Sequence, residues 1–191
     1  MQSNVIKMPE VVQETDEQVM ERIATRFDIL DEMTKATVAG DVRAMIVVGP
    51  PGVGKSYGVE YQLEKAGMFD KISNKKVRYE VIKGAMTPIG LYCTLYKYSD
   101  AKNVLVFDDC DIWEDPDALN ILKALCDTSS SRKVSYMKEA PQLRENDIPQ
   151  QFEFDGAMIF ISNLDFQTFV DEGKNKYAQH FEALMSRSLY L

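Results

Sequence analysis

The stretch VVGPPGVGKSYG, residues 47–58, decides the fold class of this chain of 191 residues. Three glycines and two prolines separate its apolar start from a lysine and a serine. Gly49, Gly54, Lys55 and Ser56 have the G-x-x-x-x-G-K-[ST] spacing of a phosphate-binding loop. Glycine lets the main chain direct its N–H groups at a polyphosphate where side chains would block the approach. The stretch therefore predicts a site for the phosphates of a nucleotide.

The sequence on both sides of this loop supports the prediction. The apolar run AMIVV, 44–48, is typical of a buried strand, and residues 57–67 predict a helix that ends at Gly67. The amino end of that helix would favour an anion through its free N–H groups and its dipole. We expect Lys55 to reach the β- and γ-phosphates and Ser56 to hold Mg²⁺. The expected nucleotide contacts are Gly49, Pro50, Pro51, Gly52, Val53, Gly54, Lys55, Ser56 and Tyr57.

Composition and charge restrict the class of protein. No window is apolar for long enough to span a bilayer, and the amino terminus lacks the apolar core of a secretory signal, so we expect a cytoplasmic protein. The net charge of −8 argues against a globally basic nucleic-acid-binding protein, although a ring could gather a few lysines in its pore. The three cysteines have no metal-binding spacing and are expected to be reduced, mostly buried thiols.

The remaining sequence predicts alternating strands and helices. Residues 1–14 are expected to be poorly ordered, and 15–191 to form one nucleotide-binding domain. Thr15 and Gln18 have capping-box spacing, so a helix should begin there and end at Gly40; packing on the core is expected, with partner binding as the alternative. Further strands are expected at 76–84, 103–107, 156–162 and from 188, further helices at 87–99, 115–128 and 176–187, and short strands around 133–137 and 151–154. This order predicts an α/β three-layer sandwich with a five-stranded, mostly parallel sheet.

Two carboxylates follow the apolar run VLVF, residues 104–107. In open α/β sheets, ligands lie at the carboxyl ends of the strands, where Asp108 and Asp109 would stand. Asp108 is placed to orient Mg²⁺ and its waters. Asp109 is placed to accept a hydrogen bond from the attacking water and so polarise it.

The loop and the two acids together resemble the Walker A and Walker B elements of P-loop NTPases. Two further positions resemble the AAA+ ATPases. Asn163, at the end of the run FISN, matches sensor 1, whose polar side chain contacts the γ-phosphate or the catalytic water. Arg187, within FEALMSRSLYL, matches the arginine finger that precedes the fifth strand. The resemblance spans roughly residues 40–191 and implies ATP and Mg²⁺ as ligands and ATP hydrolysis as the activity.

The sequence departs from this family at two points. The second Walker B acid is usually Glu, but here it is Asp109, which is one methylene shorter. The helical lid that follows the fifth strand, with its sensor-2 arginine, is absent up to Leu191. We expect a truncated chain, with a natural lack of the lid as the alternative.

The resemblance also implies a quaternary structure. A finger at Arg187 would lie far from its own nucleotide and could act only on that of a neighbour, so a head-to-tail ring, usually a hexamer, is expected. In the family, the loop at 83–88 often lines the pore, where Lys83 and Met86 could touch a threaded substrate. Packing of Met86 under the following helix is the alternative.

Three functions remain open. The first is ATP-driven remodelling or loading of a protein or a protein–DNA complex. The second is a DNA helicase motor, because the SN strand end and the trailing arginine also resemble superfamily 3 helicases. The third is a non-hydrolysing ATP-binding module that controls assembly. In style, the compact chain resembles ATPases encoded by bacteriophages, for which the host cytoplasm would be the location. The protein client is not identified, and nucleic acid is an open partner.

Overall fold

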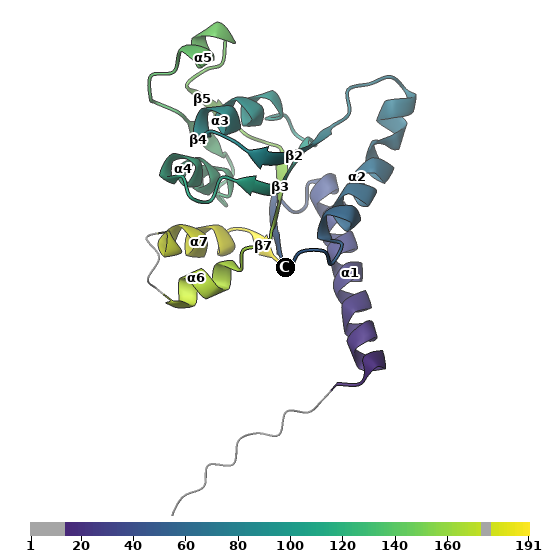
Figure 1. Ribbon diagram of the computed structural model, residues 1–191. Helices are drawn as coiled ribbons and strands as arrows, with labels where there is room; N and C mark the ends of the chain where they lie inside the picture. The colour runs from purple at the N-terminus through teal and green to yellow at the C-terminus, as the bar shows by residue number, and fades with distance from the viewer. Residues whose placement is uncertain (1–13, 173–176) are drawn as a thin grey trace, which may run out of the picture.

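The computed structural model describes residues 14–172 and 177–191, so the segment 1–14 that was expected to be poorly ordered lies, except for Glu14, outside the described residues. The chain forms a five-stranded sheet with helices on both faces (Figure 1). Every neighbouring pair of strands is parallel, which confirms the predicted three-layer α/β sandwich. In spatial order the strands are β2 (Tyr79–Ala85), β3 (Val104–Asp111), β6 (Ala157–Ser162), β1 (Ala44–Val48) and β7 (Leu189–Tyr190).

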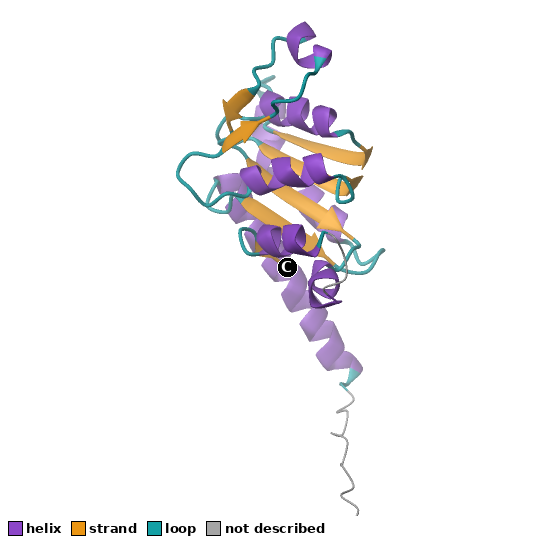
Figure 2. Cartoon of the chain, turned by 90° about the vertical axis from the view of Figure 1, so that its left-hand side faces the viewer, coloured by secondary structure: helices purple, strands orange, loops and turns teal. Residues whose placement is uncertain are grey.

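The helices form two layers that enclose two separate cores (Figures 1 and 2). One face of the sheet is covered by α1 (Asp16–Ala39) and α2 (Lys55–Ile72). The other is covered by α3 (Pro88–Lys97), α4 (Pro116–Leu125), α6 (Phe166–Glu172) and α7 (Ala178–Met185). Alternate strand residues enter opposite cores, as the period of two requires: Ile46 packs with α3 and α4, whereas Met45 and Val47 pack with α1 and α2.

A small antiparallel pair stands outside the main sheet. It consists of β4 (Lys133–Ser135) and β5 (Gln151–Glu153), which confirms the short strands expected in the polar segment. The short helix α5 (Pro141–Glu145) lies between them in the chain and was not predicted. The helix α6 was not predicted either.

The predicted helix caps are present. The hydroxyl of Thr15 accepts a hydrogen bond from the N–H of Gln18, whose side chain accepts one from the N–H of Thr15, and Gly40 ends α1 with a φ of 94°. The helices α3 and α4 begin after Thr87 and Asp115, whose side chains accept hydrogen bonds from the first turn. Local signals therefore fix where these three helices begin.

The prediction that Gly67 ends the second helix is wrong. The helix α2 begins at Lys55 and continues through Gly67 to Ile72. A Cβ atom added at Gly67 would lie 2.7 Å from a ring carbon of Tyr79 at the start of β2. The glycine is therefore explained by the close packing of this ring on the helix rather than by a helix end.

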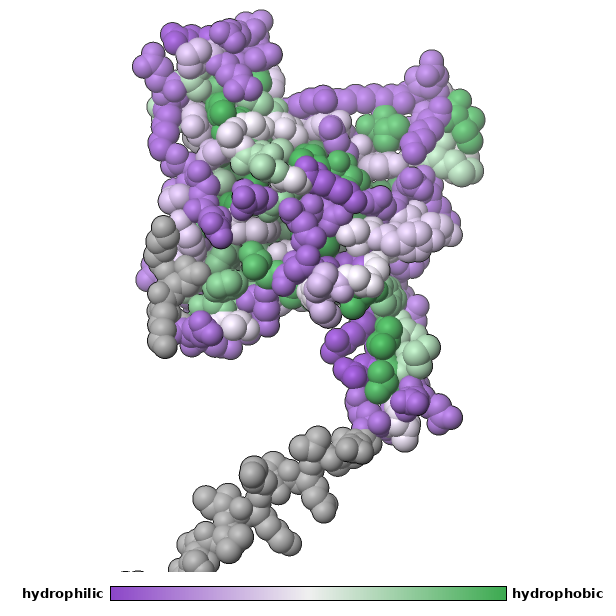
Figure 3. All heavy atoms as spheres, viewed as in Figure 1, coloured by the Kyte–Doolittle hydropathy of each residue, from purple (hydrophilic) through white to green (hydrophobic). Residues whose placement is uncertain are grey.

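Only the carboxyl half of α1 is packed as expected. Leu30, Thr34 and Thr37 are buried, whereas Met20 is 67% and Ile23 43% exposed. Figure 3 shows the corresponding apolar surface on the part of α1 that projects beyond the sheet. The helix thus packs on the core only along the half that leads into β1, and not along its whole length as expected.

Candidate nucleotide-binding site

The residues predicted to bind a nucleotide gather at the carboxyl edge of the sheet. The glycine-rich loop, residues 49–54, joins β1 to α2, and the ends of β3 and β6 lie beside it. A hollow of about 300 Å³ opens between them. It is lined by Pro51, Gly52, Gly54, Lys55, Ser56, Tyr57, Asp109 and Asn163. Eight predicted site residues, from three separate parts of the sequence, therefore line one hollow.

The loop requires glycine at two positions. Gly52 and Gly54 have φ values of 80° and 98°, which L side chains rarely adopt. A Cβ atom added at Gly54 would also lie 3.6 Å from the ring of Phe27 in α1. The loop is thus held against α1 in a shape that the motif glycines permit.

The side chain of Lys55 reaches across the loop. Its Nζ atom donates to the carbonyls of Gly49 at 2.8 Å and Pro50 at 2.9 Å, and to Oδ1 of Asn163 at 2.9 Å. These three acceptors match the three N–H groups of an ammonium. The residue is only 8% exposed, so these bonds satisfy the donors of a buried ammonium but leave its positive charge available to an anion.

Asn163 connects the loop to the end of β3. Its Oδ1 accepts from Lys55, and its Nδ2 donates to Oδ2 of Asp109 at 2.8 Å. This orientation of the amide is the one that both neighbours favour, since a cation lies on one side and a carboxylate on the other. Asp109 has a φ of 48°, a left-handed backbone conformation that is uncommon for residues other than glycine. Such local strain is a feature of functional sites.

Asp108 lies beside Ser56 and is 5% exposed. Its Oδ1 accepts the hydroxyl hydrogen bond of Ser56 at 2.9 Å, and its Oδ2 pairs with Nζ of Lys83 at 2.9 Å. Lys83 also pairs with Glu60 in α2 at 2.8 Å. Hydrogen bonds to Glu60 and to Asp108 raise the pKa of Lys83, which therefore stays charged and neutralises the buried carboxylate.

The role of Lys83 was not found in the sequence. The strand predicted at 76–84 contains Lys83, but the only role considered for this side chain was contact with a threaded substrate in a pore. It lies in β2, directly opposite Asp108 in the strand register. The signal that could have found it is this register, because the two residues stand at the same height in adjacent parallel strands. Met86 is partly buried against the core that contains α3 and α4, which supports the packing alternative for that residue.

Arg187 does not contact the glycine-rich loop. It precedes β7 and so lies at the amino edge of the sheet, the edge opposite the loop. Its Nη1 donates to the carbonyl of Lys123 in α4 at 3.3 Å. The structure thus brings together every predicted site residue that was assigned to its own nucleotide, and separates Arg187 from them.

Exposed apolar side chains adjoin the hollow. Tyr57 and Tyr61 in α2 are 76% and 50% exposed, and their rings are stacked 6.2 Å apart. Val53, in the loop, is 45% exposed. Tyr57 lines the hollow, so its ring is available to a planar ligand group.

The described part of the chain contains no group of three or more His, Cys, Asp or Glu side chains that could hold a metal ion by itself. Mg²⁺ at a nucleotide needs only one or two protein oxygens, since phosphates and water complete its shell. Ser56 and Asp108, already joined by a hydrogen bond, fit that smaller donor set. In the same part of the chain, none of the helices has the length and apolar character needed to cross a bilayer.

Comparison with known proteins gives one relative from a virus. Over 182 residues, the chain is 38% identical to an uncharacterized 36.7 kDa protein from the nrdC-mobD intergenic region of Enterobacteria phage T4. The alignment covers 95% of this chain and 54% of that protein, so the chain spans about half the length of the relative it matches. No family model matches the chain.

Proposed function

We propose that this chain binds ATP with Mg²⁺ and hydrolyses it as an ATPase of the AAA+ type. The observation that carries the proposal is the set of hydrogen bonds among the three elements at the carboxyl edge of the sheet. Lys55 bonds to Asn163, Asn163 bonds to Asp109, and Ser56 bonds to Asp108. A glycine-rich turn between a strand and a helix explains phosphate binding, but it does not require two acids and an amide beside it.

The residues around the hollow have separate proposed roles in binding and hydrolysis. The amino end of α2 and the ammonium of Lys55 bind the phosphates, with phosphate oxygens replacing carbonyl acceptors of that lysine. Asn163 orients the attacking water together with Asp109, whose carboxylate accepts its hydrogen bond. The exposed ring of Tyr57 packs on the nucleotide base. Each role uses a side chain that faces the same hollow.

Ser56 and Asp108 would hold Mg²⁺, which supplies charge neutralisation for the phosphates when bound. Asp108 is buried and its two oxygens are held by Ser56 and Lys83, so they are directed before any metal arrives. The ammonium of Lys83 shares one of these oxygens and would have to yield part of that contact to a dication.

We further propose that the working form is a head-to-tail ring, with Arg187 reaching the nucleotide of a neighbour. Support comes from its position at the amino edge of the sheet, opposite the hollow of its own chain. Remodelling or loading of a protein or a protein–DNA complex in the cytoplasm of a bacterial host would be the role of this ring. The location rests on the phage relative.

The proposal is tested by nucleotide binding. Replacing Lys55 by Ala removes the ammonium that joins the carbonyls of the loop to Asn163, so the affinity for a fluorescent ATP analogue should fall at least about tenfold. Fluorescence titration with Mg²⁺ measures it, with Lys65→Ala, an exposed lysine of the same helix, as the matched control. An unchanged affinity in the Lys55 variant would contradict the assignment of the loop.

A further inference from the structure

A second polar hollow lies at the amino edge of the sheet, the edge opposite the glycine-rich loop. It measures about 280 Å³ and opens where the chain enters β1, β3 and β6. It is lined by Thr37, Gly40, Arg43, Ala101, Lys102, Ser130, Arg132, Asp155, Gly156 and Ala157. We call it the basic hollow, because three of these side chains are cations and one is a carboxylate.

Arg132 is a buried cation without a carboxylate partner. It is 5% exposed, and no ion pair joins it to an acid within the described residues. Its Nη2 donates to the carbonyl of Gly156 at 2.6 Å and its Nη1 to that of Leu125 at 3.3 Å, while its guanidinium lies 5.2 Å from the ring centre of Phe154. Carbonyls satisfy hydrogen bonds but carry no full negative charge, so the positive charge stays largely uncompensated.

The other cations of the basic hollow increase this excess. Burial and the charge of Arg43 lower the pKa of Arg132, whereas the charge of Asp155 raises it. Arg43 donates a 2.8 Å hydrogen bond to the carbonyl of Ser129, which fixes its position. Lys102 lies just before the first residue of β3. Three positive side chains against one negative make a local excess in a chain whose net charge is −8. An oxyanion would relieve the repulsion between these cations.

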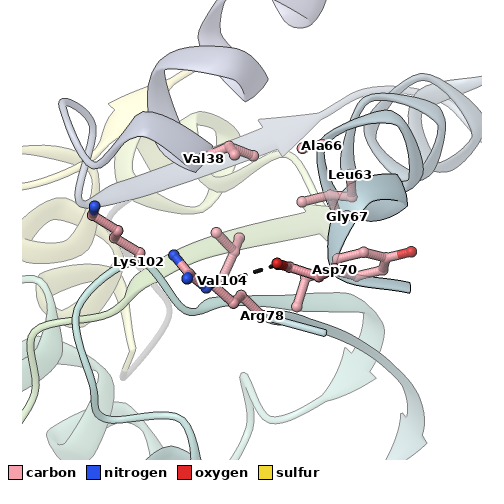
Figure 4. A pocket seen from close by; sticks show the side chains of 9 residues that line it. Val38, Leu63, Ala66, Gly67, Asp70, Arg78, Lys102 and Val104 are labelled. Atoms are coloured by element: carbon pink, nitrogen blue, oxygen red, sulfur yellow. Dashed lines mark ion pairs between the residues drawn. The ribbon is translucent and has the colours of Figure 1, made fainter. Parts of the chain in front are cut away.

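A neighbouring hollow differs from the basic hollow in that one of its two cations is paired with a carboxylate. It shares Lys102 but measures about 140 Å³, and its apolar lining comes from α1, α2, β2 and β3 (Figure 4). The remaining cation there, Arg78, pairs with Asp70 at 3.8 Å (Figure 4). The unpaired charge therefore belongs to the basic hollow.

We propose that the basic hollow binds a phosphate group. Arg43, Lys102 and Arg132 supply the positive charge, and the hydroxyl of Ser130 lies at the rim as a further donor. The phosphate belongs either to a small free phosphate compound or to the backbone of a single-stranded nucleic acid, which share this chemistry. The site lies on the opposite edge from the candidate ATP site and does not depend on the proposed ATPase activity.

Thermal unfolding in phosphate tests the site. The melting temperature should rise by about 3 °C in 20 mM phosphate relative to chloride of equal ionic strength. The double variant Arg43→Gln/Lys102→Asn should lose this rise; Asn is chosen because Lys102 has a φ of 68°, which Asn tolerates. The control Lys35→Gln/Lys65→Gln, which removes the same charge from α1 and α2, should keep the rise. All of these variants are compared in the Lys55→Ala background, so that the glycine-rich loop adds no phosphate response of its own.

A gain-of-binding variant makes the test independent of any loss of stability. Asp155→Asn removes the only carboxylate of the basic hollow, so the phosphate-dependent rise should become larger, and the charge-retaining variant Arg43→Lys should keep it. If the double variant and its Lys55→Ala parent respond equally to phosphate, or if Asp155→Asn leaves the rise unchanged, the basic hollow is not a phosphate site.

Binding of a labelled single-stranded oligothymidylate then identifies the source of the phosphate. Anisotropy is measured at 50 and 200 mM salt with the same variants. A nucleic-acid source predicts salt-sensitive binding that the double variant weakens at least about tenfold and Lys55→Ala preserves. A small-compound source predicts that the melting temperature still rises in phosphate. The oligonucleotide should then show no binding that depends on Arg43 and Lys102, and it should not compete with phosphate.

Discussion

Asp109 combines a short acidic side chain with a left-handed backbone conformation. It is a non-glycine residue with a φ of 48°, and its carboxylate is held by Nδ2 of Asn163 at 2.8 Å. Asp tolerates the left-handed region better than Glu because its short side chain can hydrogen-bond locally. The backbone turn therefore explains why a shorter acid can face the hollow at this position.

Replacing Asp109 by Asn should separate nucleotide binding from hydrolysis. The amide keeps the size of the side chain but accepts a proton poorly, so turnover should fall about 10²- to 10⁴-fold while ATP affinity stays near that of the wild type. A coupled phosphate-release assay beside an equilibrium titration measures both quantities.

The matched control is Asp111→Asn, which changes an exposed acid in the same strand. It should leave turnover within a few-fold of the wild type. Wild-type turnover in Asp109→Asn together with a large loss in Asp111→Asn would move the role of the base to Asp111.

At the scale of the elements, the entry into β6 is packed closely against the main chain of other segments. A Cβ atom added at Gly156 would lie 2.8 Å from the carbonyl oxygen of Tyr98, 3.1 Å from that of Asn103 and 3.0 Å from the ring of Phe154. Two of these neighbours are main-chain atoms that cannot rotate away. Gly156 thus lets β6 enter the centre of the sheet beside the turn that leads to β3.

Gly156→Ala should destabilise the domain by about 2–3 kcal/mol, as overpacking of a closed site does. The urea midpoint of unfolding measures the change. Gly58→Ala is the control: it lies in α2, its new Cβ would meet Leu30 at an ordinary 3.4 Å, and the gain in helix propensity should stabilise by up to about 1 kcal/mol. Equal midpoints for the two variants would contradict this reading of the packing.

Element boundaries could be predicted where the deciding contacts are local. The capping box at Thr15 and Gln18 and the Thr87–Pro88 start each involve residues within one turn, and both are confirmed. Gly67 was misread because the contact that explains it comes from Tyr79 in the next strand. Signals within the helix alone could not show that ring.

The same distinction applies to the candidate site. Spacing and strand ends were enough to predict that Lys55, Asp108 and Asn163 would meet, since parallel strands deliver their carboxyl ends to one edge. The pairing of Lys83 with Asp108 depends on register across two strands, which no local pattern encodes. The short helices α5 and α6 do have local start signals that were missed: Pro141 in the first turn of α5, and Asp165, whose carboxylate accepts a hydrogen bond from the N–H of Gln167 in α6.

At the scale of the whole molecule, the proposed ring depends on Arg187. Arg187→Ala should lower turnover by about 10³-fold or more at protein concentrations where the wild type assembles, without changing ATP affinity. The rate of the wild type should in turn rise more steeply than linearly with protein concentration. Steady-state phosphate release across a concentration series measures both effects.

A mixing experiment isolates the role of the neighbouring subunit. Lys55→Ala subunits have no working loop but retain Arg187, so adding them to Arg187→Ala subunits should restore part of the activity that neither variant has alone. If mixtures remain as inactive as their components while both variants assemble normally, Arg187 does not act across an interface.

The strand order has a consequence for biosynthesis. The pairing of β1 with β6 joins Ala44 to Met158, and the side chain of Lys55 finds its amide partner at residue 163. On a ribosome, which releases the chain from its amino end, the glycine-rich loop is translated long before the strand that completes it. The nascent polypeptide should therefore hold an unfinished pocket until β6 and Asn163 have emerged from the ribosome.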